Sequence, residues 1–144
     1  MAFAKLGAGN EEVAGAGLGY VSVFDSAGNK IKTLVSNGPL NAPWGLTIAP
    51  ASFGKYAGAL LVGNFGDGKI NAFNVKTGAF LGTLESTPGN PLQIDGLWAL
   101  RNGPDGTVVF SAGPDDEEHG LLGVVQPTWA KASWAFQSHV KLGR

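Results

Sequence analysis

The chain has 144 residues, which is long enough for one ordinary domain with a buried core. Its apolar fraction of 44% excludes a disordered chain, and its net charge of −1 gives no electrostatic basis for binding nucleic acid or anionic lipid. Because the chain has no cysteine, disulfides and thiolate metal sites are also excluded.

The sequence shows no segment for crossing or entering a membrane. No apolar run approaches the roughly 18 residues of a membrane-spanning helix. The start, MAFAKLGAGNEEV, lacks the basic and apolar regions of a secretion signal. We therefore expect no membrane span and find no signal peptide in this sequence.

Glycine content and charge distribution are both unusual. Glycine accounts for 23 of the 144 residues, well above the usual roughly 7%, which favours many tight turns between short strands. The charge is uneven, because residues 1–127 hold all eleven acidic residues and seven of the basic ones, whereas residues 128–144 hold three basic residues.

Strand signals dominate from the first elements onward. Tyr20–Asp25 and Lys30–Val35 alternate around the turn SAGN, which predicts a β-hairpin. Lys69–Asn74 and Ala79–Glu85 repeat this pattern around VKTG. No helical periodicity of any length precedes residue 128, so the pattern predicts an all-β protein.

A second internal match relates Trp44–Pro50 (WGLTIAP) to Trp98–Pro104 (WALRNGP), each followed by a Leu/Val-rich strand. Together with the hairpins, it defines a unit of four short antiparallel strands. Units of about 45–50 residues with this content are typical of β-propeller blades. The sequence therefore predicts about three propeller-like blades, or half of a six-bladed propeller, and a generic β-sandwich is the alternative.

Several stretches resemble one protein family: GAGLGYVSVFDSAGN, GPLNAPWGLTIAPASFG, LLVGNFGDGKINAFN, TGAFLGTL, and IDGLWAL with FSAGPDDEEHGLLG. They resemble the C-terminal half of an uncharacterised family of bacterial secreted proteins with NHL-like six-bladed propeller repeats, whose members often end in an exosortase-type sorting tail. The resemblance covers roughly residues 4–125. It implies a propeller fold and an extracellular or cell-envelope location, with no agreed activity.

The chain departs from that family at both ends. The N-terminal half of the family is missing, and residues 128–144 do not resemble its terminus. We therefore expect a partial propeller domain at 1–127 and a separate C-terminal tail at 128–144, whose apolar pattern fits either a strand or a helix. A half-propeller leaves two open sheet faces, so we expect a homodimer that closes a six-bladed ring.

In propellers of this kind, the loops that carry function share one end of the molecule. The loops expected there are Ser36–Pro43, Asn64–Gly68, Ser86–Gly96 and Gly113–Gly120.

The loop NFGDG contains Asn64 and Asp67. The Asp67-Gly68 pair is a strong signal for a tight hairpin turn. Alternatively, the side-chain oxygens of Asn64 and Asp67 are ligands for a hard cation such as Ca²⁺, although the spacing of a calcium-binding loop is absent.

The loop PDDEEHG places four consecutive acidic residues, Asp115 to Glu118, before His119. It is either a solvated acidic loop or a metal site, with Asp115 and Glu118 as ligands and His119 as a further ligand or catalytic general base.

The tryptophans divide into two pairs. Trp44 and Trp98 occupy equivalent positions in the repeat, which favours structural packing between neighbouring blades. Trp129 and Trp134 lie in the tail, where exposed indole rings suit stacking on a sugar or filling a partner's pocket.

Two functions remain open on this basis. The first is a non-catalytic binding or assembly module, with a carbohydrate or another small molecule as its ligand. The second is a metal-dependent hydrolase or lactonase, by analogy of fold with gluconolactonases, which hold a divalent ion at the propeller axis. Asn64, Asp95 and Glu118 are the expected ligands in that case, and calcium is the expected cation.

Overall fold

The structure is a computed structural model that describes residues 1–128 and 136–141. Its strands are β1 (Ala2–Phe3), β2 (Tyr20–Phe24), β3 (Lys30–Ser36), β4 (Pro43–Ile48), β5 (Leu60–Asn64), β6 (Ile70–Phe73), β7 (Phe80–Thr83), β8 (Glu85–Thr87), β9 (Asn90–Pro91), β10 (Leu97–Asn102), β11 (Val108–Ala112), β12 (Leu121–Pro127) and β13 (Phe136–Lys141). Three 3-10 turns, at Ala8–Asn10, Ala51–Tyr56 and Pro104–Gly106, are the helical segments of the described residues.

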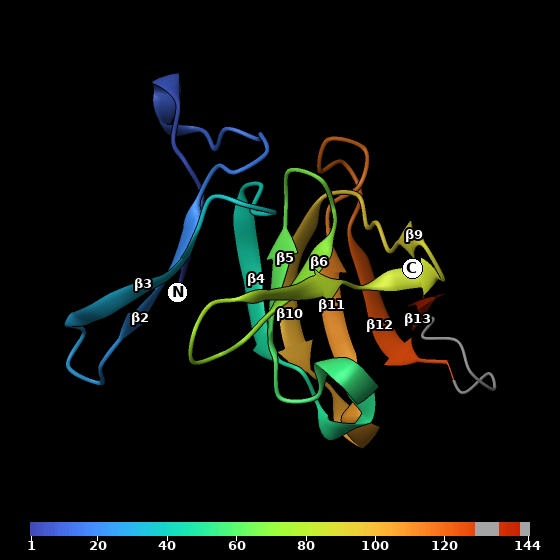
Figure 1. The fold of residues 1–144 in the computed structure, drawn as a ribbon. Helices are drawn as coiled ribbons and strands as arrows, with labels where there is room; N and C mark the ends of the chain where they lie inside the picture. Colours follow the sequence, from blue (N-terminus) through green and yellow to red (C-terminus); the bar gives the residue numbers. More distant parts are fainter. Residues whose placement is uncertain (129–135, 142–144) are drawn as a thin grey trace.

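The strands form three antiparallel sheets that follow one another along the chain (Figure 1). The first sheet has the order β1-β2-β3, the second β4-β5-β6-β7 and the third β10-β11-β12-β13, while β8 and β9 pair as a small hairpin. The predicted all-β class and the four-stranded antiparallel units are thus confirmed, although the first sheet contains three strands. No sheet of the described residues closes into a barrel.

The second and third sheets share the same irregularity, which confirms that they are repeats. The pairing of β4 with β5 is irregular between Pro43 and Gly45, at Trp44, and the pairing of β10 with β11 is irregular between Leu97 and Ala99, at Trp98. Trp44 and Trp98 are therefore equivalent, as predicted. Trp44 is nevertheless 47% exposed and lies against the ring of Phe65, so it does not fill the space between sheets.

The second sheet lies between the other two and is buried on both faces. Leu61, Ile70 and Ala72 pack in one cluster with Leu100 and Phe110 of the third sheet. Val62 and Phe73 pack on the opposite face, with residues of the first sheet and its outgoing loop that include Val21, Val35 and Leu40. A two-sheet sandwich buries one face of each sheet, so this three-layer order departs from the sandwich alternative.

Glycines allow the second and third sheets to approach closely. A Cβ on Gly45 of β4 would lie 2.8 Å from the backbone nitrogen of Leu100 in β10. A Cβ on Gly63 of β5 would lie 2.9 Å from Leu97 Cδ2. These contacts are tighter than side chains accept, so the glycines set how closely β4 and β10 lie.

The two predicted hairpins close with the same side-chain device. Asp25 Oδ1 accepts hydrogen bonds from the backbone nitrogens of Ala27 and Asn29, and Asn74 Oδ1 accepts equivalent bonds from Lys76 and Thr77. The side-chain amide of Asn29, followed by its backbone N–H, holds the pKa of the Asp25 carboxyl below its usual value. Short polar side chains that bond the backbone ahead of them favour such turns.

The C-terminal tail contributes to the third sheet. β13 pairs with β12 in an antiparallel register from Leu122↔Lys141 to Pro127↔Phe136. Trp129 and Trp134, to which we assigned a stacking role, lie outside the described residues. No helix in the described part of the chain is long and apolar enough to span a membrane, in agreement with the prediction.

Two glycines test the close contact between Gly96, which precedes β10, and Gly113, which follows β11. Gly96 and Gly89 both have left-handed backbone, with φ of +60° and +81°, but an added Cβ meets the Gly113 carbonyl at Gly96 and nothing within 4 Å at Gly89. We expect Gly89→Ala to lower the free energy of unfolding by about 1 kcal/mol through backbone strain alone. Gly96→Ala adds a clash and should cost about 3 kcal/mol.

Urea denaturation of the two variants measures both costs. Equal destabilisation by the two alanines would show that the contact between Gly96 and Gly113 is unimportant.

Candidate functional site

Three of the four expected loops, at 36–43, 64–68 and 113–120, gather at one end of the three sheets together with the last part of the fourth, and hydrogen bonds connect them in series (Figure 1). The first part of the fourth loop instead forms the β8–β9 hairpin at the side of the molecule. Asn64 Nδ2 donates to the Pro39 carbonyl at 2.8 Å, which joins the loop before the second sheet to the loop after β5. Ile94 N donates to Gly68 O at 2.9 Å, and Gly113 N donates to Gly96 O at 2.8 Å. The loops are therefore held by the sheets and by one another.

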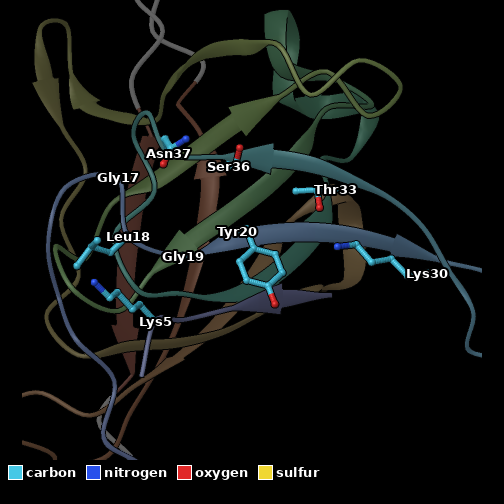
Figure 2. A pocket seen from close by; sticks show the side chains of 9 residues that line it. All are labelled: Lys5, Gly17, Leu18, Gly19, Tyr20, Lys30, Thr33, Ser36 and Asn37. Carbon is cyan, nitrogen blue, oxygen red and sulfur yellow. The ribbon is translucent and has the colours of Figure 1, made fainter. Parts of the chain in front are cut away.

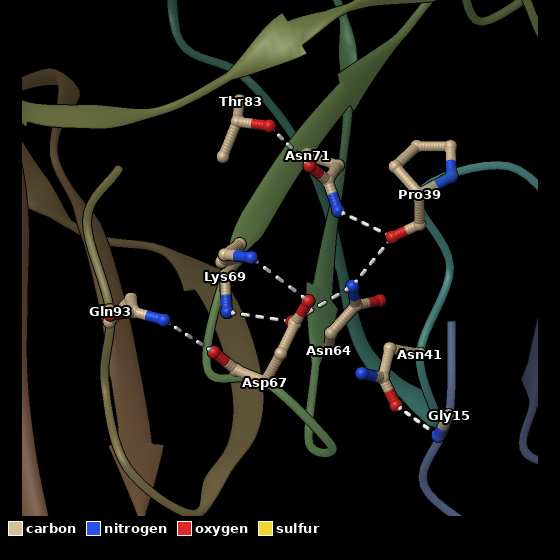
Figure 3. A network of polar contacts seen from close by, with 9 residues as sticks. All are labelled: Gly15, Pro39, Asn41, Asn64, Asp67, Lys69, Asn71, Thr83 and Gln93. Carbon is tan, nitrogen blue, oxygen red and sulfur yellow. Dashed lines mark hydrogen bonds and ion pairs between the residues drawn. The ribbon is translucent and has the colours of Figure 1, made fainter. Parts of the chain in front are cut away.

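A polar network surrounds the turn between β5 and β6 (Figure 3). Asp67 Oδ1 accepts hydrogen bonds from Asn64 Nδ2 at 3.1 Å and from Lys69 N at 3.2 Å. Asp67 Oδ2 lies 3.5 Å from Lys69 Nζ. Gly68 N donates to Asn64 O, so the segment also makes the tight turn that the Asp-Gly pair predicts.

Asn71 extends this network inside the second sheet. Its side chain is 1% exposed, its Nδ2 donates to Pro39 O at 3.0 Å, and its Oδ1 accepts from the Thr83 hydroxyl at 2.7 Å. Asn71 was not among the predicted site residues. The signal was available, because the hairpin repeat places a polar residue at this buried position in both copies, Ser22 in the first and Asn71 in the second.

The predicted cation ligands Asn64 and Asp67 are brought together, but with the amide NH₂ group facing the carboxylate. The Asn64 carbonyl oxygen is buried and has no hydrogen-bond partner among the described residues. An oxygen that points away from Asp67 does not share a cation with it in this arrangement, since both ligands of a cation must present oxygen.

The acidic loop lies at the same end of the third sheet. Asp95 Oδ2 accepts a hydrogen bond from Asp115 N at 3.2 Å, and His119 Nε2 lies 3.9 Å from Asp115 Oδ2. Glu117 Oε1 accepts from Trp98 Nε1 at 2.8 Å. The side chains of Asp115 and His119 are about 70% exposed, at 74% and 68%.

The backbone of this loop is strained. Asp115, Asp116 and Glu117 have φ of 55°, 52° and 67°, three successive non-glycine residues in the left-handed region. Each such residue costs roughly 1–2 kcal/mol, so the bonds to Asp95 and Trp98 hold the loop against its own preference.

The structure thus places the expected metal ligands apart from one another. Asn64 pairs with Asp67, Asp95 lies beside Asp115, and Glu118 joins neither pair. In the part of the chain that the structure describes, no group of three or more His, Asp or Glu side chains is placed to hold one metal ion. The calcium site and the catalytic role of His119 remain predictions.

A wide, open pocket of about 630 Å³ lies on the outer face of the first sheet (Figure 2). Lys5 and Lys30 lie on two sides of the Tyr20 ring, with Thr33 and Ser36 along the neighbouring strand. Phe3 stacks on Tyr20 with ring centroids 4.8 Å apart. Within the described residues, neither lysine forms an ion pair with a carboxylate, so both charges face the pocket unneutralised.

Comparison with known proteins gives relatives of viral origin. The chain is 42% identical over 111 residues to the uncharacterized protein L690 of Acanthamoeba polyphaga mimivirus, covering 74% of this chain and 29% of the relative. It is 39% identical over 119 residues to the uncharacterized protein R648 of the same virus, covering 80% of this chain and 29% of the relative. No protein-family model and no solved structure matches the chain.

These relatives correct one expectation. The resemblance to a bacterial secreted NHL-like family is wrong, because the similar proteins are mimivirus proteins. The stretches that suggested it form tight turns and buried strands in this structure. The extracellular or envelope location rested on that resemblance alone and is not carried forward. The chain spans less than a third of the length of these relatives.

The equivalent positions Ser22 and Asn71 allow a matched test of the network. The Ser22 hydroxyl is buried and has no partner among the described residues, so Ser22→Ala should raise the free energy of unfolding by about 1 kcal/mol. Asn71→Leu removes two hydrogen bonds and should lower it by about 2 kcal/mol. Thermal and urea denaturation measure both, and equal effects of the two substitutions would contradict the role assigned to Asn71.

Proposed function

We propose that this protein is a non-catalytic binding and assembly module of the propeller type, in which two copies close a ring of six sheets. The observation that supports this proposal is that the second sheet is covered on both faces, whereas the first and third sheets each keep a large apolar side chain exposed on one face, Tyr20 at 39% and Leu122 at 61%.

In the repeat, the outer faces of the first and third sheets correspond to the two faces that are buried in the second sheet. In the repeat alignment, Phe24 of the first sheet matches Phe73, which faces the preceding sheet, and Phe24 is only partly buried whereas Phe73 is 1% exposed. In the third sheet, Leu122 matches Ile70, which packs toward the following sheet. Leu122 is 61% exposed, whereas Ile70 is fully buried. The outer face of the third sheet therefore corresponds to a face that packs on the following sheet, and the outer face of the first sheet corresponds to a face that packs on the preceding sheet. The two outer faces are complementary in this sense.

A two-fold axis satisfies both faces at once. In the proposed ring, the third sheet of one copy lies next to the first sheet of the other copy. The aromatic face formed by Phe3, Tyr20 and Phe24 then covers Leu122. The same contact forms a second time on the opposite side of the ring. Apolar sheet faces of this kind favour association by removing their surface from water.

Charges on the two faces are also complementary. Lys5 and Lys30 line the pocket of the first sheet, and the exposed carboxylates of Asp115 to Glu118 lie beside the third sheet. In the closed ring, the acidic loop of one copy meets the basic pocket of the other. This attraction selects the partner face and accelerates the encounter.

Charge reversal tests the assembly. The wild-type protein should have a mass in light scattering of about twice its 14.8 kDa. Lys5→Glu with Lys30→Glu should weaken the dimer about tenfold or more, and so should Asp116→Lys with Glu118→Lys, because each change places like charges at both contacts. An equimolar mixture of the two variants should regain the dimer, since opposite charges then meet at both contacts.

Lys55→Glu with Lys76→Glu is the matched control, because these lysines lie outside the pocket. A wild-type protein that stays monomeric at high concentration would contradict the proposal. So would a mixture of the two variants that associates no better than either alone.

A further inference from the structure

A second, smaller cavity of about 220 Å³ lies between the loop that precedes the second sheet and strands β6 and β7. Polar side chains from both sides line it: Asn41 from the loop, Asp67 and Lys69 from the turn after β5, Asn71 from β6 and Thr83 from β7. It is separate from the pocket proposed for assembly, which lies on the outer face of the first sheet.

Hydrogen bonds hold the walls of the cavity in place, and a buried polar group with an incomplete set of hydrogen bonds lies behind them. Asn71 is 1% exposed and is fixed by two hydrogen bonds. Asn64 is fully buried beside the cavity, and its NH₂ group is held by Pro39 and Asp67, which both line it. Figure 3 shows the Asn64 carbonyl oxygen turned away from Asp67, toward the side of Pro39 and Asn41. This oxygen has no hydrogen-bond donor among the described residues, and it lies behind the lining rather than in it.

The charges of the cavity select an uncharged ligand. The carboxylate of Asp67 and the ammonium of Lys69 are paired at 3.5 Å, so the lining has no net charge to attract an ion. The remaining groups are amides and a hydroxyl, which both donate and accept. The volume lies below the roughly 300–1,000 Å³ typical of drug-sized ligands, which limits the occupant to about one small ring.

We propose that this cavity binds a small uncharged polyol, such as a single monosaccharide ring, with the hydroxyls of the ligand bonded to Asp67, Asn71 and Thr83. This inference rests on the proposed function in one respect, that the chain is a binding module, and it adds the class of ligand and the cavity that binds it.

The test is a titration of the ¹⁵N-labelled protein with glucose, galactose, mannose and myo-inositol, with glucuronate and glucosamine as charged probes. We expect at least one neutral probe to shift the side-chain amide signals of Asn64 and Asn71, and the charged probes to bind more weakly. Asp67→Asn keeps an oxygen acceptor at the turn and should weaken binding about tenfold, because the charged acceptor makes the stronger hydrogen bond. Thr83→Val should also weaken it.

Thr77→Val is the control, since Thr77 is an exposed residue of the β6–β7 turn outside the cavity. The inference is overturned if no neutral probe shifts either amide at 50 mM, a concentration on the order of weak single-sugar binding. It is also overturned if Asp67→Asn and Thr83→Val, both folded by their spectra, bind as tightly as Thr77→Val. Light scattering on the same samples separates the two proposals: a dimer that binds no sugar overturns only the cavity assignment, and a monomer that binds sugar overturns only the assembly.

Discussion

Burial of the second sheet on both of its faces holds the other two sheets and the connecting loops in their places. Every residue of 61–64 and 70–73 is buried, although strands β5 and β6 are only four or five residues long. Side chains alternate, so Leu61 and Ile70 pack toward the third sheet and Val62 and Phe73 toward the first. Burying one such side chain contributes roughly 1.5–3 kcal/mol, and short strands are stable only with packing of this kind.

The same constraint determines where binding can occur. Because the second sheet is sealed by its neighbours, the loops at one end are drawn into a continuous series of hydrogen bonds. The small polar cavity lies inside that series, between the first and second sheets, and hydrogen bonds of Asp67 and Asn71 hold its lining in place. The outer sheets each keep a large apolar side chain exposed on one face, Tyr20 in the first and Leu122 in the third, which is the physical basis of the proposed assembly.

Local rules predicted much of the fold from the sequence. The hairpin turns at Asp25 and Asn74 follow from short polar side chains bonded to the next residues, and the equivalence of Trp44 and Trp98 follows from the internal repeat. What could not be predicted depends on neighbours distant in sequence. The orientation of the Asn64 amide is set by the Pro39 carbonyl, which comes from the preceding loop.

The resemblance to a bacterial family failed for a related reason. Glycine turns, a Trp-containing first strand and alternating apolar residues suit any chain that builds such sheets, so they indicate architecture and not lineage.

Native-state hydrogen exchange can show whether the second sheet is the most stable part of the structure, because it measures the stability of each strand separately. We expect the amides of β5 and β6 to exchange last, at the rate of global unfolding. Exchange of β5 and β6 before β2 and β3, or before β11 and β12, would contradict the claim that the doubly buried second sheet holds the structure together.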